Sequence, residues 1–169
     1  MLLWKAAREK ATDIRAGFGN APLSFDDLLH IAGIFGATVH IRPLKPEYSG
    51  VIIKEQNSPA DIYINASEPV TRQRFTLAHE IGHLVERTDV ANDEDFSFVD
   101  TRAEDKYDLH EFFADEFAGA LLMPERALIQ EVQAQGEYGA AEHFGVSISA
   151  VRRRLNRVTQ NPSETRIDR

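Results

Sequence analysis

The stretch His79-Glu80-Ile81-Gly82-His83 decides the fold that this sequence predicts. Residues four apart lie one above the other on an α-helix, so both imidazoles can share one tetrahedral Zn²⁺ ion. Glu80 leans toward the open side of that ion, where its carboxylate can take a proton from water and return it to a leaving amine. The pattern predicts a zinc-dependent peptidase site. The alternative is a buried helix whose two histidines bond each other or the backbone.

A third protein ligand is expected, because two histidines alone hold Zn²⁺ poorly. In one class of zinc peptidase it lies six residues after the second histidine, beyond a sharp turn at a glycine. That offset gives Asp89, but Glu86 occupies the glycine position and its Cβ disfavours the turn. In the other class, a glutamate from a later helix completes the site.

Residues 109–118 suit that later helix. Apolar residues recur at helical spacing, and Phe113 and Phe117 share one side of the helix. Glu111 and Asp115 are four apart and share another face. We predict that Glu111 binds the metal, and that Asp115 accepts the second N–H of a ligating histidine and fixes its orientation. Either carboxylate alone would be interpreted as a solvated helix residue, and the upstream histidine motif favours the metal site.

Two blocks of sequence carry a family resemblance. Residues 72–84 read Arg-Gln-Arg-Phe-Thr-Leu-Ala-His-Glu-Ile-Gly-His-Leu, residues 111–118 read Glu-Phe-Phe-Ala-Asp-Glu-Phe-Ala, and Leu-Leu-Met-Pro follows at 121–124. This pattern resembles the ImmA/IrrE-type zinc metallopeptidases over about residues 25–158. The family often has a second glutamate where this chain has Phe113, which leaves Glu111 as the matching ligand. The resemblance implies a regulatory protease that cleaves a helix-turn-helix transcriptional repressor.

Composition limits the class of protein. A chain of 169 residues is long enough for one domain with a good core, and we expect residues 1–169 to form a single metallopeptidase domain. The net charge of −8 argues against nonspecific attraction to DNA or to an anionic membrane, and the absence of cysteine excludes thiolate ligands. The sequence has no apolar run of membrane-spanning length, so we expect a cytoplasmic protein.

The order of patterns predicts an α+β fold. Residues 3–16 and 24–35 have helical patterns, and the β-branched stretches at 38–42, 51–54 and 61–65 are predicted strands. The acidic segment 89–108 shows no sustained period and is predicted to be a flap or to lack regular structure. We therefore expect a small β-sheet packed against a zincin-like catalytic helix, with additional helices around it.

Residues 138–158 have the spacing of a helix-turn-helix pair. Four arginines on the second helix could meet phosphates; alternatively they form a solvated face or bind a protein partner. Direct DNA binding is the weaker interpretation, because a lone helical pair without a second basic element is a weak signal. These arginines are Arg152, Arg153, Arg154 and Arg157.

The main hypothesis is a zinc-dependent endopeptidase with Glu80 as general base and then general acid. The second is a metal-containing transcription regulator or partner-binding module without peptidase activity. Glu80 argues against the second, because a structural zinc site has no need of that carboxylate. The oxyanion of the reaction also needs a donor. Tyr107, His110 and His143 are candidates between which the sequence does not choose.

Overall fold

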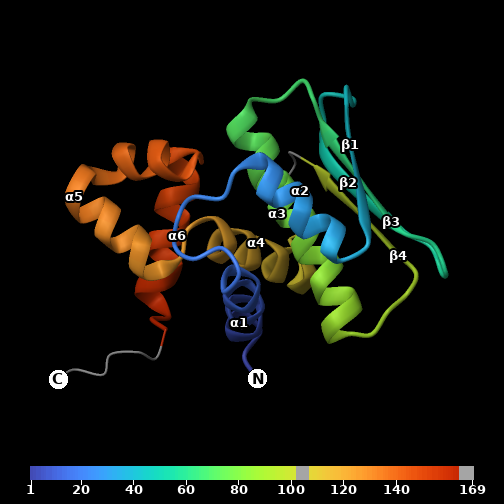
Figure 1. Ribbon diagram of the computed structural model, residues 1–169, viewed down its shortest axis with the longest axis horizontal. Coiled ribbons are helices and arrows are strands. Elements are labelled where there is room, and N and C mark those ends of the chain that lie inside the picture. Colours follow the sequence, from blue (N-terminus) through green and yellow to red (C-terminus); the bar gives the residue numbers. More distant parts are fainter. Residues whose placement is uncertain (102–106, 164–169) are drawn as a thin grey trace.

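The computed structural model describes residues 1–101 and 107–163, and over these ranges the chain forms six α-helices, one π-helical turn and four strands (Figure 1). The predicted α+β class is confirmed, and each helix and strand predicted before residue 66 is present. The elements are α1 (Leu3–Arg15), α2 (Phe25–Ile34), β1 (Ala37–Arg42), β2 (Tyr48–Lys54), β3 (Ala60–Asn65), α3 (Val70–Val85), the π-helix η1 (Glu86–Val90), β4 (Phe96–Thr101), α4 (Leu109–Leu122), α5 (Glu125–Phe144) and α6 (Ile148–Gln160).

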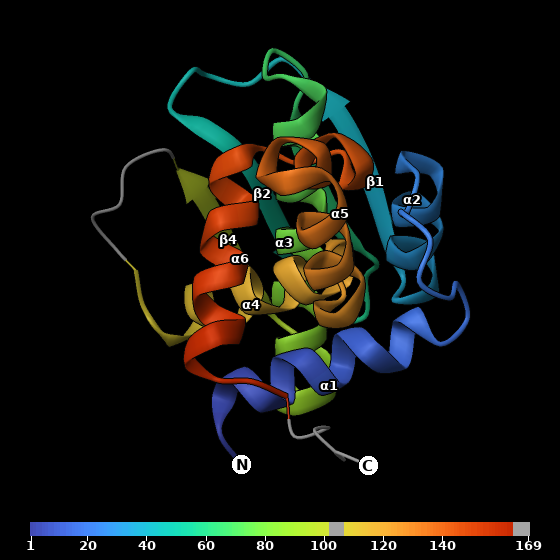
Figure 2. The same cartoon turned by 90° about the vertical axis from the view of Figure 1, so that its left-hand side faces the viewer.

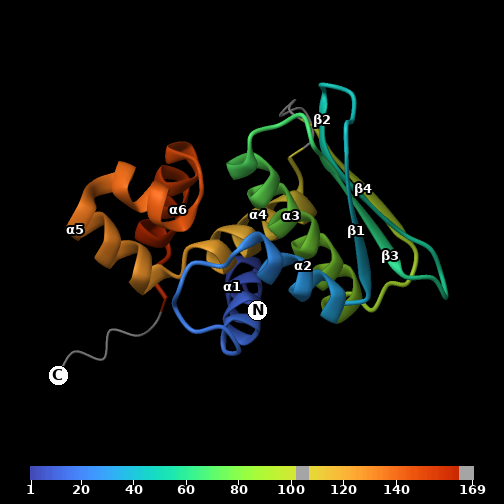
Figure 3. The same cartoon turned by 45° about the horizontal axis from the view of Figure 1, so that its top comes forward.

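The strands of the described residues form one mixed sheet in the order β1-β3-β2-β4. β1 pairs with β3 in parallel, whereas β2 runs antiparallel to both of its neighbours. Alternation of side chains puts Ile52, Ile62 and Ile64 on one face, where all three are fully buried. Figures 1 and 3 show α2 and α3 against that face, so the catalytic helix expected from sequence packs on the sheet.

The prediction that residues 89–108 lack regular structure is wrong for Phe96–Thr101. These residues form β4, which pairs antiparallel with β2. Phe96 and Phe98 occupy alternate positions and face the helices, as a strand with one buried face requires. Residues 102–106 of the predicted segment lie outside the described residues.

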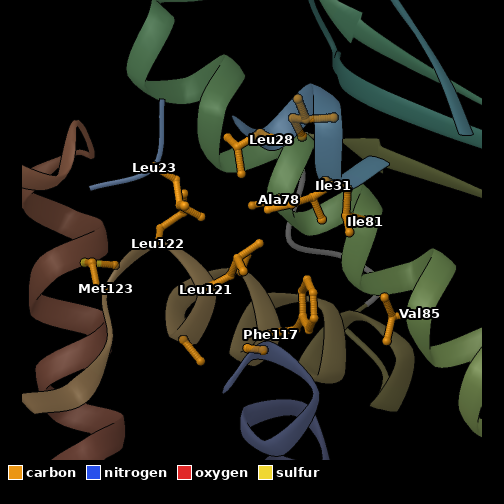
Figure 4. Packing of buried hydrophobic residues seen from close by; sticks show 14 of the residues in the cluster. Leu23, Leu28, Ile31, Ala78, Ile81, Val85, Phe117, Leu121, Leu122 and Met123 are labelled. Carbon is orange, nitrogen blue, oxygen red and sulfur yellow. The ribbon is translucent and has the colours of Figure 1, made fainter. Parts of the chain in front are cut away.

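The core lies between the sheet, α3 and α4 (Figure 4). α3 and α4 approach closely at Gly82, where a Cβ atom would lie only 2.9 Å from the Cα atom of Ala114. Ridges of apolar side chains from both helices fill the space on either side of this crossing. The contributing residues labelled in Figure 4 are Ala78, Ile81 and Val85 of α3, Phe117, Leu121 and Leu122 of α4, and Leu28 and Ile31 of α2.

The C-terminal helices lie at the end of the molecule away from the sheet (Figures 1 and 2). α5 is interrupted at Gly136, so residues 137–144, the left-handed turn at Gly145 and α6 give the predicted helix-turn-helix geometry. The expectation of four exposed arginines on α6 is wrong for Arg154, which is 4% exposed and donates to Glu116 at 2.9 Å. Among the described residues, no helix is both long and apolar enough to cross a membrane.

Candidate metal centre

His79 and His83 of α3 converge with Glu111 of α4. The Nε2 atoms of the two histidines lie 3.1 Å apart, and each lies 3.1 Å from one carboxylate oxygen of Glu111. One turn of helix separates the histidines, and the close crossing of α3 and α4 brings the glutamate to them. Side chains from two helices thus present three potential metal ligands to one point.

The spacing of these atoms fits a tetrahedral metal ion. Two ligand atoms each about 2.05 Å from such an ion lie about 3.3 Å apart, close to the separations observed here. Both histidines are buried, whereas the Glu111 side chain is 20% exposed. Two imidazoles and one carboxylate form the ligand set of many catalytic zinc sites, which leave one coordination position open.

Asp115 is hydrogen-bonded to His79, at the ring nitrogen that faces away from Glu111 and His83. Its Oδ1 atom lies 2.9 Å from Nδ1 of His79, one helical turn along α4 from Glu111. A proton on Nδ1 donated to Asp115 leaves the lone pair of Nε2 directed at the metal position. The structure therefore places Asp115 where the sequence interpretation expected it.

The site distributes charge unevenly between the two imidazoles. Burial disfavours the charged form of His79, but hydrogen bonds to Asp115 and Glu111 outweigh that effect and raise the pKa of His79 well above its ordinary value. Burial and the nearby charge of His79 lower the pKa of His83 to about 4. Partial burial opposes ionisation of Glu111, yet hydrogen bonds from both imidazoles lower its pKa. These shifts favour the doubly protonated, positively charged form of His79 beside a neutral His83, and a metal ion must displace the additional proton of His79.

Glu80 lies beside these ligands, and its carboxyl group has no hydrogen-bond partner among the described residues. The side chain is fully buried. Burial raises the pKa of Glu80 well above its ordinary value, and the charges of Asp100 and Glu111 add to the effect. The absence of a side chain at Gly50 of β2 leaves space for the Glu80 carboxyl group, because a Cβ atom there would lie 3.0 Å from Oε1 of Glu80. A carboxylate in this state is a strong proton acceptor.

β4 supplies two residues that the sequence interpretation missed. The ring of Phe98 stacks on His83 with a centroid separation of 4.1 Å and shields that imidazole. Asp100 lies two residues further along the same face, and burial raises the pKa of its carboxyl group. The charge of Asp100 acts on His79 and Glu111, so this carboxylate borders the metal site. A strand puts every second residue on the same face, and this spacing holds for Phe96, Phe98 and Asp100. That alternation could have predicted β4, and with it Phe98 and Asp100, from the sequence.

Asp89, the competing third ligand, lies away from the convergence point. Helical φ and ψ angles continue through Glu86, so the sharp turn that would deliver Asp89 does not form. Its carboxylate instead lies 3.6 Å from Lys10.

The three candidate oxyanion donors have partners elsewhere. His110 lies 2.9 Å from Glu86, and the Tyr107 hydroxyl accepts a hydrogen bond from Arg157 at 2.6 Å. His143 lies 3.8 Å from Glu131, on its own helix. Two of the three also lie near residues described above: the charge of Asp115 acts on Tyr107, and the ring centroid of His110 lies 5.5 Å from that of Phe98.

Comparison with known proteins agrees with this geometry. Residues 32–156 match the M78 peptidase family, described as the IrrE N-terminal-like domain, and the chain belongs to that family. The resemblance seen in the sequence is therefore confirmed. The chain is 32% identical over 138 residues to the radiation response metalloprotease IrrE of Deinococcus radiodurans. The alignment covers 80% of this chain and 40% of that relative, so the chain spans less than half of the relative's length.

Proposed function

We propose that this protein is a zinc-dependent endopeptidase whose metal ligands are His79, His83 and Glu111. The observation that carries the proposal is the convergence of these three side chains beside Glu80, which is buried and has no hydrogen-bond partner in the part of the chain that the structure describes. A structural zinc site would need no such carboxylate. Membership of a peptidase family and similarity to a protein named as a metalloprotease support the same function.

Zn²⁺ bound here would supply Lewis acidity, acidifying water and polarising a substrate carbonyl. Glu80 accepts the proton of the attacking water, because among the described residues its oxygens have no hydrogen-bond partner, and then delivers it to the leaving amine. Asp115 keeps the Nδ1 proton of His79 in place while the opposite nitrogen binds the metal. Phe98 excludes water from one side of His83, which strengthens electrostatic interactions within the site.

The proposed substrate is a protein, and more narrowly a cytoplasmic transcriptional repressor of the helix-turn-helix type. Resemblance to the ImmA/IrrE family is the support for the repressor.

The experiment uses the purified full chain with one equivalent of Zn²⁺ and a candidate helix-turn-helix repressor as substrate. Mass spectrometry should find one cleaved peptide bond in the repressor. Glu80→Gln is the matched control, since it should retain zinc and fold but not cleave. If the zinc-loaded protein cleaves neither this repressor nor an unfolded protein such as casein, the peptidase proposal fails.

A transcription regulator is the second candidate function, favoured by the helix-turn-helix geometry of 137–160. Arg152 and Arg153 are its most exposed arginines, with side chains 60% and 51% exposed. Two cations are a small electrostatic footprint on a chain of net charge −8. Titration of duplex DNA with the protein at low and high salt separates this candidate from the peptidase.

A further inference from the structure

The second oxygen of Asp115 faces α6. Oδ1 bonds to His79, whereas Oδ2 lies 3.7 Å from Nη1 of Arg153 and 3.8 Å from Nη2 of Arg157. These separations exceed hydrogen-bond length, so both contacts are electrostatic. The Arg157 side chain is 18% exposed and that of Arg153 is 51% exposed, so water screens the charge of Arg157 less. Arg157 is therefore the stronger partner of Asp115.

Tyr107 connects Arg157 to Asp115 more directly. Its hydroxyl accepts a hydrogen bond from Nη2 of Arg157 at 2.6 Å, and the charge of Asp115 acts on it. Partial burial of the hydroxyl and the charge of Asp115 raise the pKa of Tyr107 to about 12, so the hydroxyl keeps its proton. A protonated hydroxyl can accept from Arg157 and donate to Asp115 at the same time. The chain of contacts then runs from Arg157 through Tyr107 and Asp115 to His79.

Arg157 is itself fixed by α4. Its Nη1 atom donates to Oε2 of Glu116 at 3.3 Å, and its guanidinium lies over the ring of Phe112, 5.1 Å from the centroid. The other oxygen of Glu116 accepts from Arg154 and from Arg8 of α1, at 2.9 and 2.6 Å. This polar cluster holds α6 against α4, so the position of Arg157 depends on the docking of α6.

Arg8 also fixes the end of α6. Its two Nη atoms donate to the backbone carbonyls of Arg157 and Asn161, at 3.3 and 2.5 Å. Figures 1 and 2 show α1 beneath α4 and near the last turn of α6. The last turn of α6 therefore cannot shift without breaking bonds to α1.

We propose that Arg157 is a positioning residue for the metal site. Together with Tyr107 it holds Asp115 in the orientation that directs Nε2 of His79 toward the metal, so the docking of α6 sets metal affinity. Groups that orient a ligating histidine commonly change metal affinity about 10- to 100-fold when they are removed. The second helix of the helix-turn-helix pair thus acts on the metal site rather than on DNA. This inference rests on the proposed metal site.

The test compares zinc dissociation constants of full-length variants by competition with a chromophoric chelator. Arg157→Gln should weaken zinc binding about tenfold, and Tyr107→Phe should weaken it about threefold. Arg157→Lys retains the charge and should recover part of the loss. Arg152→Gln is the matched control, because Arg152 pairs with Glu137 at 2.5 Å and should leave zinc affinity unchanged.

A second measurement separates positioning from a merely structural role. In the zinc-loaded protein, the NMR resonance of the His79 Nδ1 proton should shift in Tyr107→Phe, while the metal-free variant unfolds at the wild-type temperature. That stability is expected because Tyr107 is 54% exposed. Wild-type zinc affinity and an unshifted resonance in both Arg157→Gln and Tyr107→Phe would overturn the inference, even if Arg157→Gln is less stable. Failure of the wild-type protein to bind zinc would overturn the proposed function as well.

Discussion

The carboxylate of Glu80 is fully buried, and among the described residues it has no hydrogen-bond partner. Burial of a charged carboxylate without a partner destabilises the fold, and groups buried in this way are common where a side chain transfers a proton. We expect Glu80→Gln to lower peptidase turnover about 10²- to 10⁴-fold while zinc content stays at the wild-type value. The metal-free variant should be at least as stable as the wild type, because an amide loses less hydration on burial.

Turnover, zinc content and thermal unfolding of Glu80→Gln test this expectation together. Cleavage at the native rate would contradict the role of Glu80 as proton acceptor. Loss of zinc from the same variant would identify Glu80 as a metal ligand instead.

The third ligand is tested by three alanine variants. Glu111→Ala removes two carboxylate oxygens, of which one lies 3.1 Å from His79 and the other 3.1 Å from His83, and it should weaken zinc binding most. Asp115→Ala should weaken it about 10- to 100-fold, because His79 is then less well oriented. Asp89→Ala is the control and should leave it unchanged, since Asp89 contacts Lys10. A zinc-free Asp89→Ala protein with a zinc-replete Glu111→Ala protein would reverse the assignment.

The spacing of residues in the sequence was sufficient to predict α3 and α4, because the residues that define a helical face lie within one short segment of chain. β4 was missed, since only three alternating positions stand within an acidic stretch and the strand depends on pairing with β2. Phe98 and Asp100 were missed with it. Gly50 could not have been interpreted either, because its role depends on how closely Glu80 of α3 approaches β2. The burial of Arg154 likewise follows from a partner on another helix, Glu116.

The crossing of α3 and α4 at Gly82 is the contact between elements that brings the candidate metal ligands together. Gly82→Ala would put a Cβ atom 2.9 Å from the Cα atom of Ala114, a backbone atom that cannot move aside alone. We expect the two helices to separate, which should reduce the free energy of unfolding by about 1–3 kcal/mol. Zinc affinity should also fall, because Glu111 moves away from the histidines.

The matched control is Gly33→Ala in the last turn of α2. No neighbouring atom lies within 4 Å of a Cβ at that position, and alanine is the better helix former by about 1 kcal/mol. Urea unfolding of the metal-free proteins and zinc titration give both quantities. An unchanged zinc affinity in Gly82→Ala would show that helix separation does not determine the site.

At the scale of the whole molecule, the carboxylate of Glu116 joins three helices. It is 1% exposed and lies against guanidinium groups from α1 and α6. Glu116→Ala would leave buried positive charges without a counter-charge, and we expect a loss of about 3–5 kcal/mol in the free energy of unfolding. Glu137→Ala breaks the exposed pair with Arg152 and should reduce the free energy of unfolding far less, because water screens this pair. Equal losses in the two variants, measured by urea unfolding, would contradict a structural role for the Glu116 cluster.

A chain of net charge −8 that presents two exposed arginines at one end can dock a partner there. Arg154 cannot take part, because it is buried against Glu116. We therefore expect Arg152→Glu combined with Arg153→Glu to slow cleavage of the cognate repressor about tenfold, a change in encounter rate typical of exposed charges at an interface. Cleavage should also become less sensitive to salt, since attraction between exposed charges is screened beyond about 10 Å at 0.1 M.

Zinc content is the necessary control for this double variant, because Arg153 lies 3.7 Å from Asp115. Arg152→Glu alone should slow cleavage less and leave zinc unchanged, since Arg152 pairs with Glu137 on α5. Initial cleavage rates from 50 to 300 mM salt, at equal zinc occupancy, measure the effect of docking apart from that of the metal site. A DNA-binding surface loses affinity with each phosphate contact that is removed. If the double variant cleaves at the wild-type rate but no longer binds duplex DNA, these two arginines bind DNA. The transcription-regulator hypothesis would then be the better one.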